Sequence, residues 1–122
     1  MTEGAGNPGV QDWQAVCPLA AIEVDRGVAA LVHGRAIAIF RTEDGKVYAL
    51  GNHDPFAKAS MLARGIVGTR GDAPFVASPM HKQAFDLRNG QCLDDKQVRV
   101  PSYDVRVVDG IIHIGGKRAV VR

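Results

Sequence analysis

The chain has 122 residues, 46% of them hydrophobic, so we expect one domain whose core needs no metal or disulfide. The 15 basic and 13 acidic residues give a net charge of +2, and scattered basic residues argue against nucleic acid as a partner. The first residues lack the basic start and apolar run of a signal peptide, and no later stretch is long enough to cross a bilayer. We therefore expect a cytoplasmic protein without a membrane partner.

Residues 1–12 are rich in glycine and small polar side chains and are expected to form a flexible tail before one domain at 13–122. In this domain, short apolar runs rich in β-branched residues alternate with glycine-containing turns, and no segment keeps a helical period for long. The sequence therefore predicts an all-β fold of small stacked antiparallel sheets. The predicted strands are Val28–Val32, Arg35–Phe40, Lys46–Leu50, Phe75–Ala77, Gln83–Leu87, Val105–Val108 and Ile111–Ile114.

Turn residues and hydrophobic patterns refine this prediction. The His-Gly pair at 33–34 and the Asp-Gly pair at 109–110 are typical of tight hairpin turns. The segment 35–40 is apolar at consecutive positions, which predicts a strand covered on both faces, whereas 103–107 alternates as a half-exposed strand does. Between 51 and 79 the strand pattern is lost, and only a short helical turn at Ser60–Ala63 is expected.

Two motif classes are missing from the sequence. Cys17 and Cys92 lack the Cys-x-x-Cys spacing of metal sites and redox pairs, so both are expected to be free, partly buried thiols. No glycine-rich phosphate loop lies between a predicted strand and a helix, so the domain is expected to bind neither NAD(P)H nor FAD itself.

Two loops resemble the cluster-binding loops of Rieske iron–sulfur domains. The first, about 51–59, begins Gly-Asn-His-Asp, and the second, about 76–90, begins Val-Ala-Ser-Pro-Met-His. In that family, a Cys-x-His in the first loop and a Cys-Pro-x-His in the second hold a two-iron cluster. The resemblance covers nearly all of the chain after Trp13 and implies a Rieske-like fold with a loop-rich, degenerate cluster-binding part.

The ligand positions of this resemblance carry mostly other residues. Asn52 and Ser78 take the two cysteine positions. Asp54 takes the first histidine position, and only His81 keeps its type. A neutral amide and a protonated hydroxyl do not replace the thiolates that disperse the charge of an iron–sulfide core. The resemblance therefore implies a chain without a cluster, a resident metal ion or a catalytic residue.

One branch of this family is similar to the chain in more detail. The segments Ser60–Gly68 and Gly90–Asp95, together with the second loop, resemble the small subunit of assimilatory NAD(P)H-dependent nitrite reductase. This resemblance implies a large subunit as partner, which carries FAD, an iron–sulfur cluster and sirohaem and reduces nitrite to ammonium. It implies that this chain has a non-redox accessory role, in which it stabilises or orients the large subunit.

Side chains in and beside the two loops are candidates for docking a partner. If several apolar ones are exposed together they form a docking patch, with basic residues favouring an acidic partner surface. The alternative is that the apolar ones fill the space a cluster would occupy. The candidates are Phe56, Met61, Leu62, Met80 and Lys82.

Two other functions fit the same residues. The chain could be a Rieske-type ferredoxin that carries electrons with an unusual ligand set. It could also be a stand-alone binding module in which His53, Asp54 and His81 hold a single metal ion, because both loops meet at one end of the Rieske fold. Bound iron and acid-labile sulfide would identify the first alternative, and metal analysis of His81→Ala would decide the second.

Overall fold

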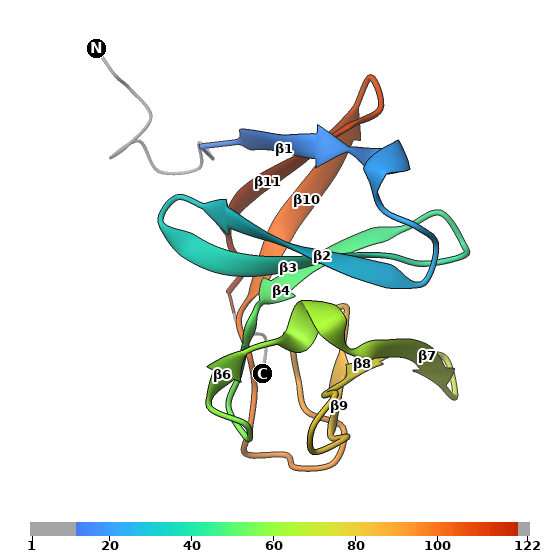
Figure 1. The fold of residues 1–122 in the computed structure, drawn as a ribbon, viewed down its shortest axis with the longest axis vertical. Helices are drawn as coiled ribbons and strands as arrows, with labels where there is room; N and C mark the ends of the chain where they lie inside the picture. The colour runs from blue at the N-terminus through green and yellow to red at the C-terminus, as the bar shows by residue number, and fades with distance from the viewer. Residues whose placement is uncertain (1–11, 120–122) are drawn as a thin grey trace.

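The computed structural model describes residues 12–119 and consists of antiparallel strands with two single-turn 3-10 helices (Figure 1). The all-β prediction is therefore confirmed. The predicted flexible tail lies outside the described residues except for Asp12. No helix in the described part of the chain is long and apolar enough to cross a membrane.

A six-stranded antiparallel sheet forms the upper part of the molecule in Figure 1. Its spatial order is β1-β11-β10-β4-β3-β2, and its two edge strands, β1 and β2, come close enough to make it a nearly closed barrel. The predicted meander is its β2–β3–β4 part, and the predicted C-terminal hairpin is β10–β11. The strands are β1 (Gln14–Pro18), β2 (Arg26–Val32), β3 (Arg35–Arg41), β4 (Val47–Gly51), β10 (Ser102–Val108) and β11 (Ile111–Lys117).

The two predicted tight turns are confirmed by the backbone. His33 and Gly34 have φ angles of 49° and 77°, and Asp109 and Gly110 have 52° and 78°. Positive φ angles at both central residues are typical of a type I′ turn, whose twist matches the right-handed twist of the two strands in a β-hairpin. The ladder residues on either side of the first turn pair in full register along β2 and β3.

A smaller, loop-rich part is inserted between β4 and β10 and occupies the lower half of Figure 1. A two-stranded ribbon of β5 and β6 leads through a 3-10 turn, η2, into a three-stranded sheet of order β7-β8-β9. The predicted helical turn is therefore present but begins two residues later than expected. The elements are β5 (His53–Asp54), β6 (Ala59–Ser60), η2 (Leu62–Arg64), β7 (Ile66–Arg70), β8 (Ala73–Ala77) and β9 (Ala84–Asp86).

β3 is buried on both faces, as predicted, because it separates two hydrophobic clusters. Ile37 and Ile39 belong to the barrel cluster, whereas Ala38 and Phe40 belong to the loop cluster, and all four are at most 1% exposed. β3 therefore joins the barrel to the loop-rich part through continuous packing. The barrel cluster further contains Ile22, Val32, Ala49, Tyr103, Ile112 and Ile114, and the loop cluster contains Leu50, Leu62, Val76, Phe85, Leu87, Cys92 and Val100.

Two kinds of feature differ from the sequence-based expectations. Four strands were not predicted: β1, which pairs with β11 far along the chain, and β5, β6 and β7, which pair across turns. The predicted alternation of residues 103–107 is wrong, since β10 runs from a buried end at Tyr103 to an exposed end at Val107. A register shift between Tyr103 and Val105 interrupts its pairing with β11, so the side chains do not keep a strict two-residue period.

Both cysteines are free, as predicted. Cys17 is half-buried, and its burial raises the pKa of the thiol above the ordinary value. Cys92 is buried and packs in the loop cluster.

Candidate functional site

The two loops predicted to resemble cluster-binding loops meet at one end of the loop-rich part. Asp54 lies in β5, directly after the barrel strand β4, and Ser78 follows the last residue of β8. The hydroxyl of Ser78 donates a hydrogen bond to Oδ2 of Asp54, which joins the loops across 24 positions of sequence. Both residues are at most 1% exposed. A direct contact therefore joins two of the positions at which the resemblance places cluster ligands.

The second carboxylate oxygen of Asp54 organises its own loop. Oδ1 accepts hydrogen bonds from the backbone N–H groups of Phe56 at 2.9 Å and Ala57 at 3.3 Å. The backbone carbonyl of Asp54 accepts from the N–H of Lys58 at 2.7 Å, which closes the turn between β5 and β6. An aspartate side chain that bonds amides two and three residues on mimics a backbone turn. Both carboxylate oxygens and the backbone carbonyl of Asp54 therefore accept hydrogen bonds that stabilise the loop.

Asn52 has the same structural role toward the 3-10 turn. Its Oδ1 accepts a hydrogen bond from the N–H of Ala63 at 2.8 Å, and its backbone carbonyl accepts from Met61 and Leu62 at 3.0 and 3.1 Å. Its own N–H donates to the carbonyl of Ala36 in β3 at 3.0 Å. Asn52 is 5% exposed, so these bonds are shielded from water. They fix η2 against the barrel.

The second loop is arranged around Ser78 in a similar way. Its hydroxyl oxygen lies 3.3 Å from the N–H groups of both Met80 and His81, and its carbonyl accepts from Lys82 at 3.0 Å. The tight turn gives Lys82 a φ of 63°, in the left-handed region. His81, the one position that keeps the family's residue type, is exposed at this turn.

These residues do not fit a two-iron cluster. The two thiolate positions hold an amide and a hydroxyl, whose oxygens accept hydrogen bonds from the backbone, and the contact between Asp54 and Ser78 occupies the space between the loops. Hard neutral oxygen donors are poor ligands for an iron–sulfide core. In residues 12–119, no three His, Cys, Asp or Glu side chains lie close enough to hold a metal ion, so His53, Asp54 and His81 do not converge.

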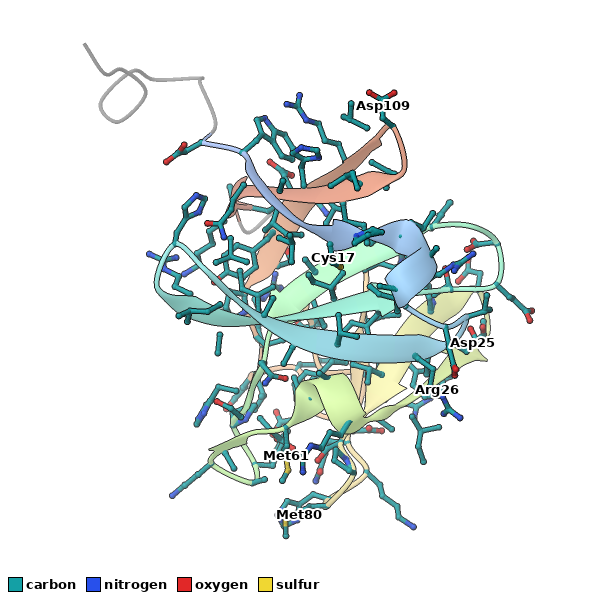
Figure 2. All side chains as sticks on the ribbon, turned by 45° about the horizontal axis from the view of Figure 1, so that its top comes forward. Cys17, Asp25, Arg26, Met61, Met80 and Asp109 are labelled. Carbon is teal, nitrogen blue, oxygen red and sulfur yellow. The ribbon has the colours of Figure 1, made fainter. Side chains whose placement is uncertain are left out.

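The predicted docking candidates separate into buried and exposed residues. Leu62 is fully buried in the loop cluster, and Phe56 packs against it with its ring centroid 6.1 Å from that of Phe85. Met61 is half-buried. Met80 is 62% exposed and Lys82 is exposed, both in the second loop. Figure 2 shows Met61 and Met80 at the same end of the molecule.

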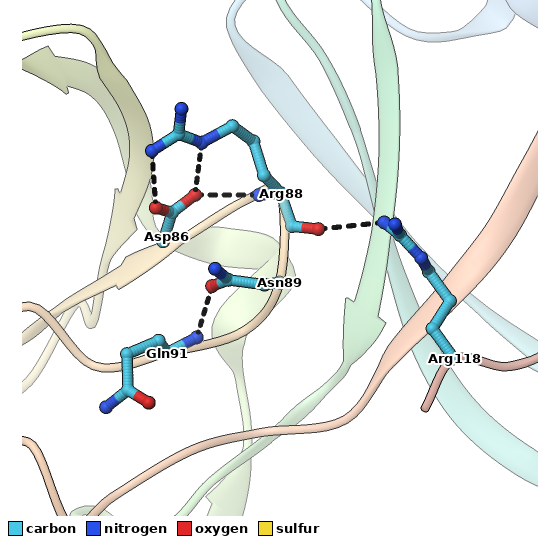
Figure 3. A network of polar contacts seen from close by, with 5 residues as sticks. All are labelled: Asp86, Arg88, Asn89, Gln91 and Arg118. Atoms are coloured by element: carbon cyan, nitrogen blue, oxygen red, sulfur yellow. Dashed lines mark hydrogen bonds and ion pairs between the residues drawn. The ribbon is translucent and has the colours of Figure 1, made fainter. Parts of the chain in front are cut away.

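A polar network on another face was not predicted from the sequence. Asp86, which is 4% exposed, holds Arg88 through two side-chain bonds of 3.0 and 2.9 Å and a backbone bond of 2.9 Å. This pairing raises the pKa of Arg88 above the ordinary arginine value. The carbonyl of Arg88 then accepts a hydrogen bond of 2.9 Å from Nη1 of Arg118, just after β11 (Figure 3). The network thus ties the turn after β9 to the end of the barrel.

A groove of about 250 Å³ lies beside this network, between residues 99–102 and the end of β11. We call it the basic groove. Arg99, Lys117 and Arg118 line it together with Asn89, Val100 and Pro101. No acidic side chain among residues 12–119 contributes to its walls. Sequence analysis missed it because its basic residues lie far apart in the chain and meet only when β11 packs beside β10.

Comparison with known proteins places these features in a family context. The family model described as Rieske-like [2Fe-2S] domain matches residues 12–115. The chain is 41% identical over 108 residues to the nitrite reductase (NADH) small subunit of Salmonella typhimurium, covering 88% of this chain and 100% of that protein. A Mycobacterium tuberculosis protein described as an NADH-dependent nitrite reductase small subunit has a crystal structure that superposes with a TM-score of 0.85 at 45% identity. The match covers 92% of this chain and 99% of that one.

A further relative has a different arrangement. The nitrite reductase large subunit of Klebsiella oxytoca is 39% identical to this chain over 110 residues. The match covers 90% of this chain but 11% of that protein. A segment similar to 90% of this chain is thus part of a much longer polypeptide.

Proposed function

We propose a function from one premise: this chain belongs to the Rieske-like [2Fe-2S] domain family and, within it, to the nitrite reductase small subunits. It is the small subunit of an NAD(P)H-dependent nitrite reductase. The observation that carries this proposal is the 41% identity to the Salmonella small subunit, which extends over the full length of that protein. In this proposal, the domain at 13–122 acts as one unit in the cytoplasm.

The role of the chain in this enzyme is contact rather than electron transfer. Three of the four ligand positions hold residues that bond the protein's own backbone and each other, which supports a domain without a cluster. The large subunit supplies the FAD, the iron–sulfur cluster and the sirohaem, and reduces nitrite to ammonium. The small subunit stabilises or orients it, with the exposed Met80 and Lys82 as proposed contacts.

The arrangement in Klebsiella supports a physical association between the two parts. There, a domain similar to 90% of this chain belongs to the same polypeptide as the rest of the large subunit. Covalent linkage fixes two domains at a high effective concentration, and separate chains need a complementary surface to stay together. We therefore expect this chain to have such a surface for its large subunit.

Co-expression with a tagged cognate large subunit tests the proposal. We expect the chain to co-purify in equal amounts, and nitrite-dependent NAD(P)H oxidation to fall when the chain is left out. A Rieske ferredoxin of similar size with intact ligands, expressed in the same way, is the matched control and should not be retained. A chain that is missing from the eluate and without effect on nitrite reduction would contradict the proposal.

A further inference from the structure

We infer that the basic groove binds an acidic segment of the nitrite reductase large subunit, an inference that rests on the proposed function. The groove concentrates positive charge on a chain whose net charge is only +2. Arg99, Lys117 and Arg118 all line it. Arg118 forms an ion pair with Asp104 at 3.4 Å, and Asp104 does not line the groove. The charged side chains that line the groove are therefore all cationic.

Arg99 is held in place by a neutral partner, whereas Arg118 is held both by a neutral carbonyl and by the carboxylate of Asp104. Nη2 of Arg99 donates to the amide oxygen of Gln91 at 2.7 Å. The amide nitrogen of Gln91 is fixed in turn by backbone carbonyls, including that of Val98 at 3.0 Å. Arg118 donates to the carbonyl of Arg88 (Figure 3). Guanidinium groups already held in position lose less side-chain entropy when they bind a carboxylate.

The shape of the groove favours side chains of a polypeptide over a cofactor. Its volume of about 250 Å³ lies below the usual range of cofactor and small-molecule sites. The half-buried Pro101 adds apolar surface beside the basic residues. Basic residues around an apolar surface are complementary to a polypeptide segment that carries both acidic and apolar side chains. Such charge complementarity fixes the orientation of the two partners and speeds their association.

Charge on the chain is also segregated, which provides an internal control. A separate hollow is lined by Asp25, Glu43 and Asp44 and shares no residue with the basic groove. Arg26 directly follows Asp25, and Lys46 lies two residues after Asp44; both are exposed and do not line the basic groove. Reversing their charges changes the net charge of the protein as much as reversing two groove residues does. A difference in affinity between the two double variants would therefore come from where the charges lie, not from the net charge of the protein.

The test compares two double variants of the intact chain for binding to the purified cognate large subunit. Arg99→Glu with Lys117→Glu should weaken the affinity by at least about tenfold. Arg26→Glu with Lys46→Glu should stay within about threefold of the native chain, since distant exposed charges are screened at physiological salt. Salt should weaken binding of the native chain more than that of the groove variant. Far-ultraviolet circular dichroism and a thermal melt confirm folding, and Lys117→Glu alone replaces the pair if the pair does not fold.

The outcomes separate this inference from the function on which it rests. If the native chain binds and both double variants bind equally well or lose affinity equally, the basic groove is not the contact, while the subunit assignment stands. If the native chain itself does not bind, the subunit assignment fails and the inference fails with it.

Discussion

Replacing Gly90 by alanine is expected to lower the free energy of unfolding by about 3 kcal/mol, the sum of a backbone cost and a steric cost. The residue has a φ of +80°, where a side chain is disfavoured. A Cβ atom there would lie 2.0 Å from the carbonyl oxygen of Val100, a distance that forces the backbone to move. Urea denaturation of the native chain and of Gly90→Ala measures the difference.

Gly110→Ala is the matched control for this prediction. Gly110 has nearly the same φ, +78°, but a Cβ atom there meets nothing within 4 Å. Its replacement should cost about 1 kcal/mol, the backbone cost alone. Equal losses for the two variants would show that the contact between Gly90 and Val100 is not as tight as the structure has it.

The close approach at Gly90 also shapes the basic groove. The N–H of Gly90 donates to the carbonyl of Asp86 at 2.8 Å, and its carbonyl accepts from the N–H of Val100 at 2.9 Å. These bonds hold the turn after β9 against residues 99–102, one wall of the groove. A glycine at this position therefore lets the two segments approach closely enough to bring Arg99 toward Arg118.

Asp54→Ala is expected to lower the free energy of unfolding by about 3 kcal/mol, because it leaves buried donors without their acceptor. The N–H groups of Phe56 and Ala57 and the hydroxyl of Ser78 all donate to this carboxylate, which is fully buried. Asp54→Asn should cost less, because its remaining oxygen can still accept from the two backbone amides. Chemical denaturation of both variants measures the effect.

The exposed carboxylate of Glu43 supplies the control, and Glu43→Ala should change the free energy of unfolding by less than about 0.5 kcal/mol. A double-mutant cycle with Ser78→Ala then measures the coupling across the two loops. We expect a coupling of about 1 to 3 kcal/mol, typical of hydrogen-bonded neighbours. Additive effects of Asp54→Ala and Ser78→Ala would contradict a direct bond between them.

Local patterns explain which parts of the fold were predictable. The turns at 33–34 and 109–110 are encoded by adjacent residues that accept positive φ angles, so the hairpins they join could be predicted. β1 is different, because its residues become a strand only by pairing with β11, about a hundred positions away. β7 carries Gly68 in its centre, where a Cβ would meet the Phe75 ring at 2.8 Å, a close approach that appears only in three dimensions.

The same distinction holds for the candidate site. The resemblance of the two loops to Rieske loops was enough to single out Asn52, Asp54, Ser78 and His81, but the bond from Ser78 to Asp54 depends on how the two loops pack together. Leu62 was a candidate for an exposed docking residue, but it is buried in the structure. The hydrogen bond from Ala63 to Asn52 holds η2 against the barrel. The basic groove combines Arg99 with Lys117, and no local pattern connects them.

We propose that this domain acts by contact, with oxygen groups of Asp54 and Ser78 bonded to each other where sulfur and imidazole would hold iron. The most direct test is the iron and acid-labile sulfide content of the chain, expressed with added iron and purified without oxygen. The account predicts less than about 0.1 iron per chain and no visible absorption band, because the donor set lacks thiolates. About two irons and two sulfides per chain, with the visible spectrum of a Rieske centre and their loss in His81→Ala, would contradict it.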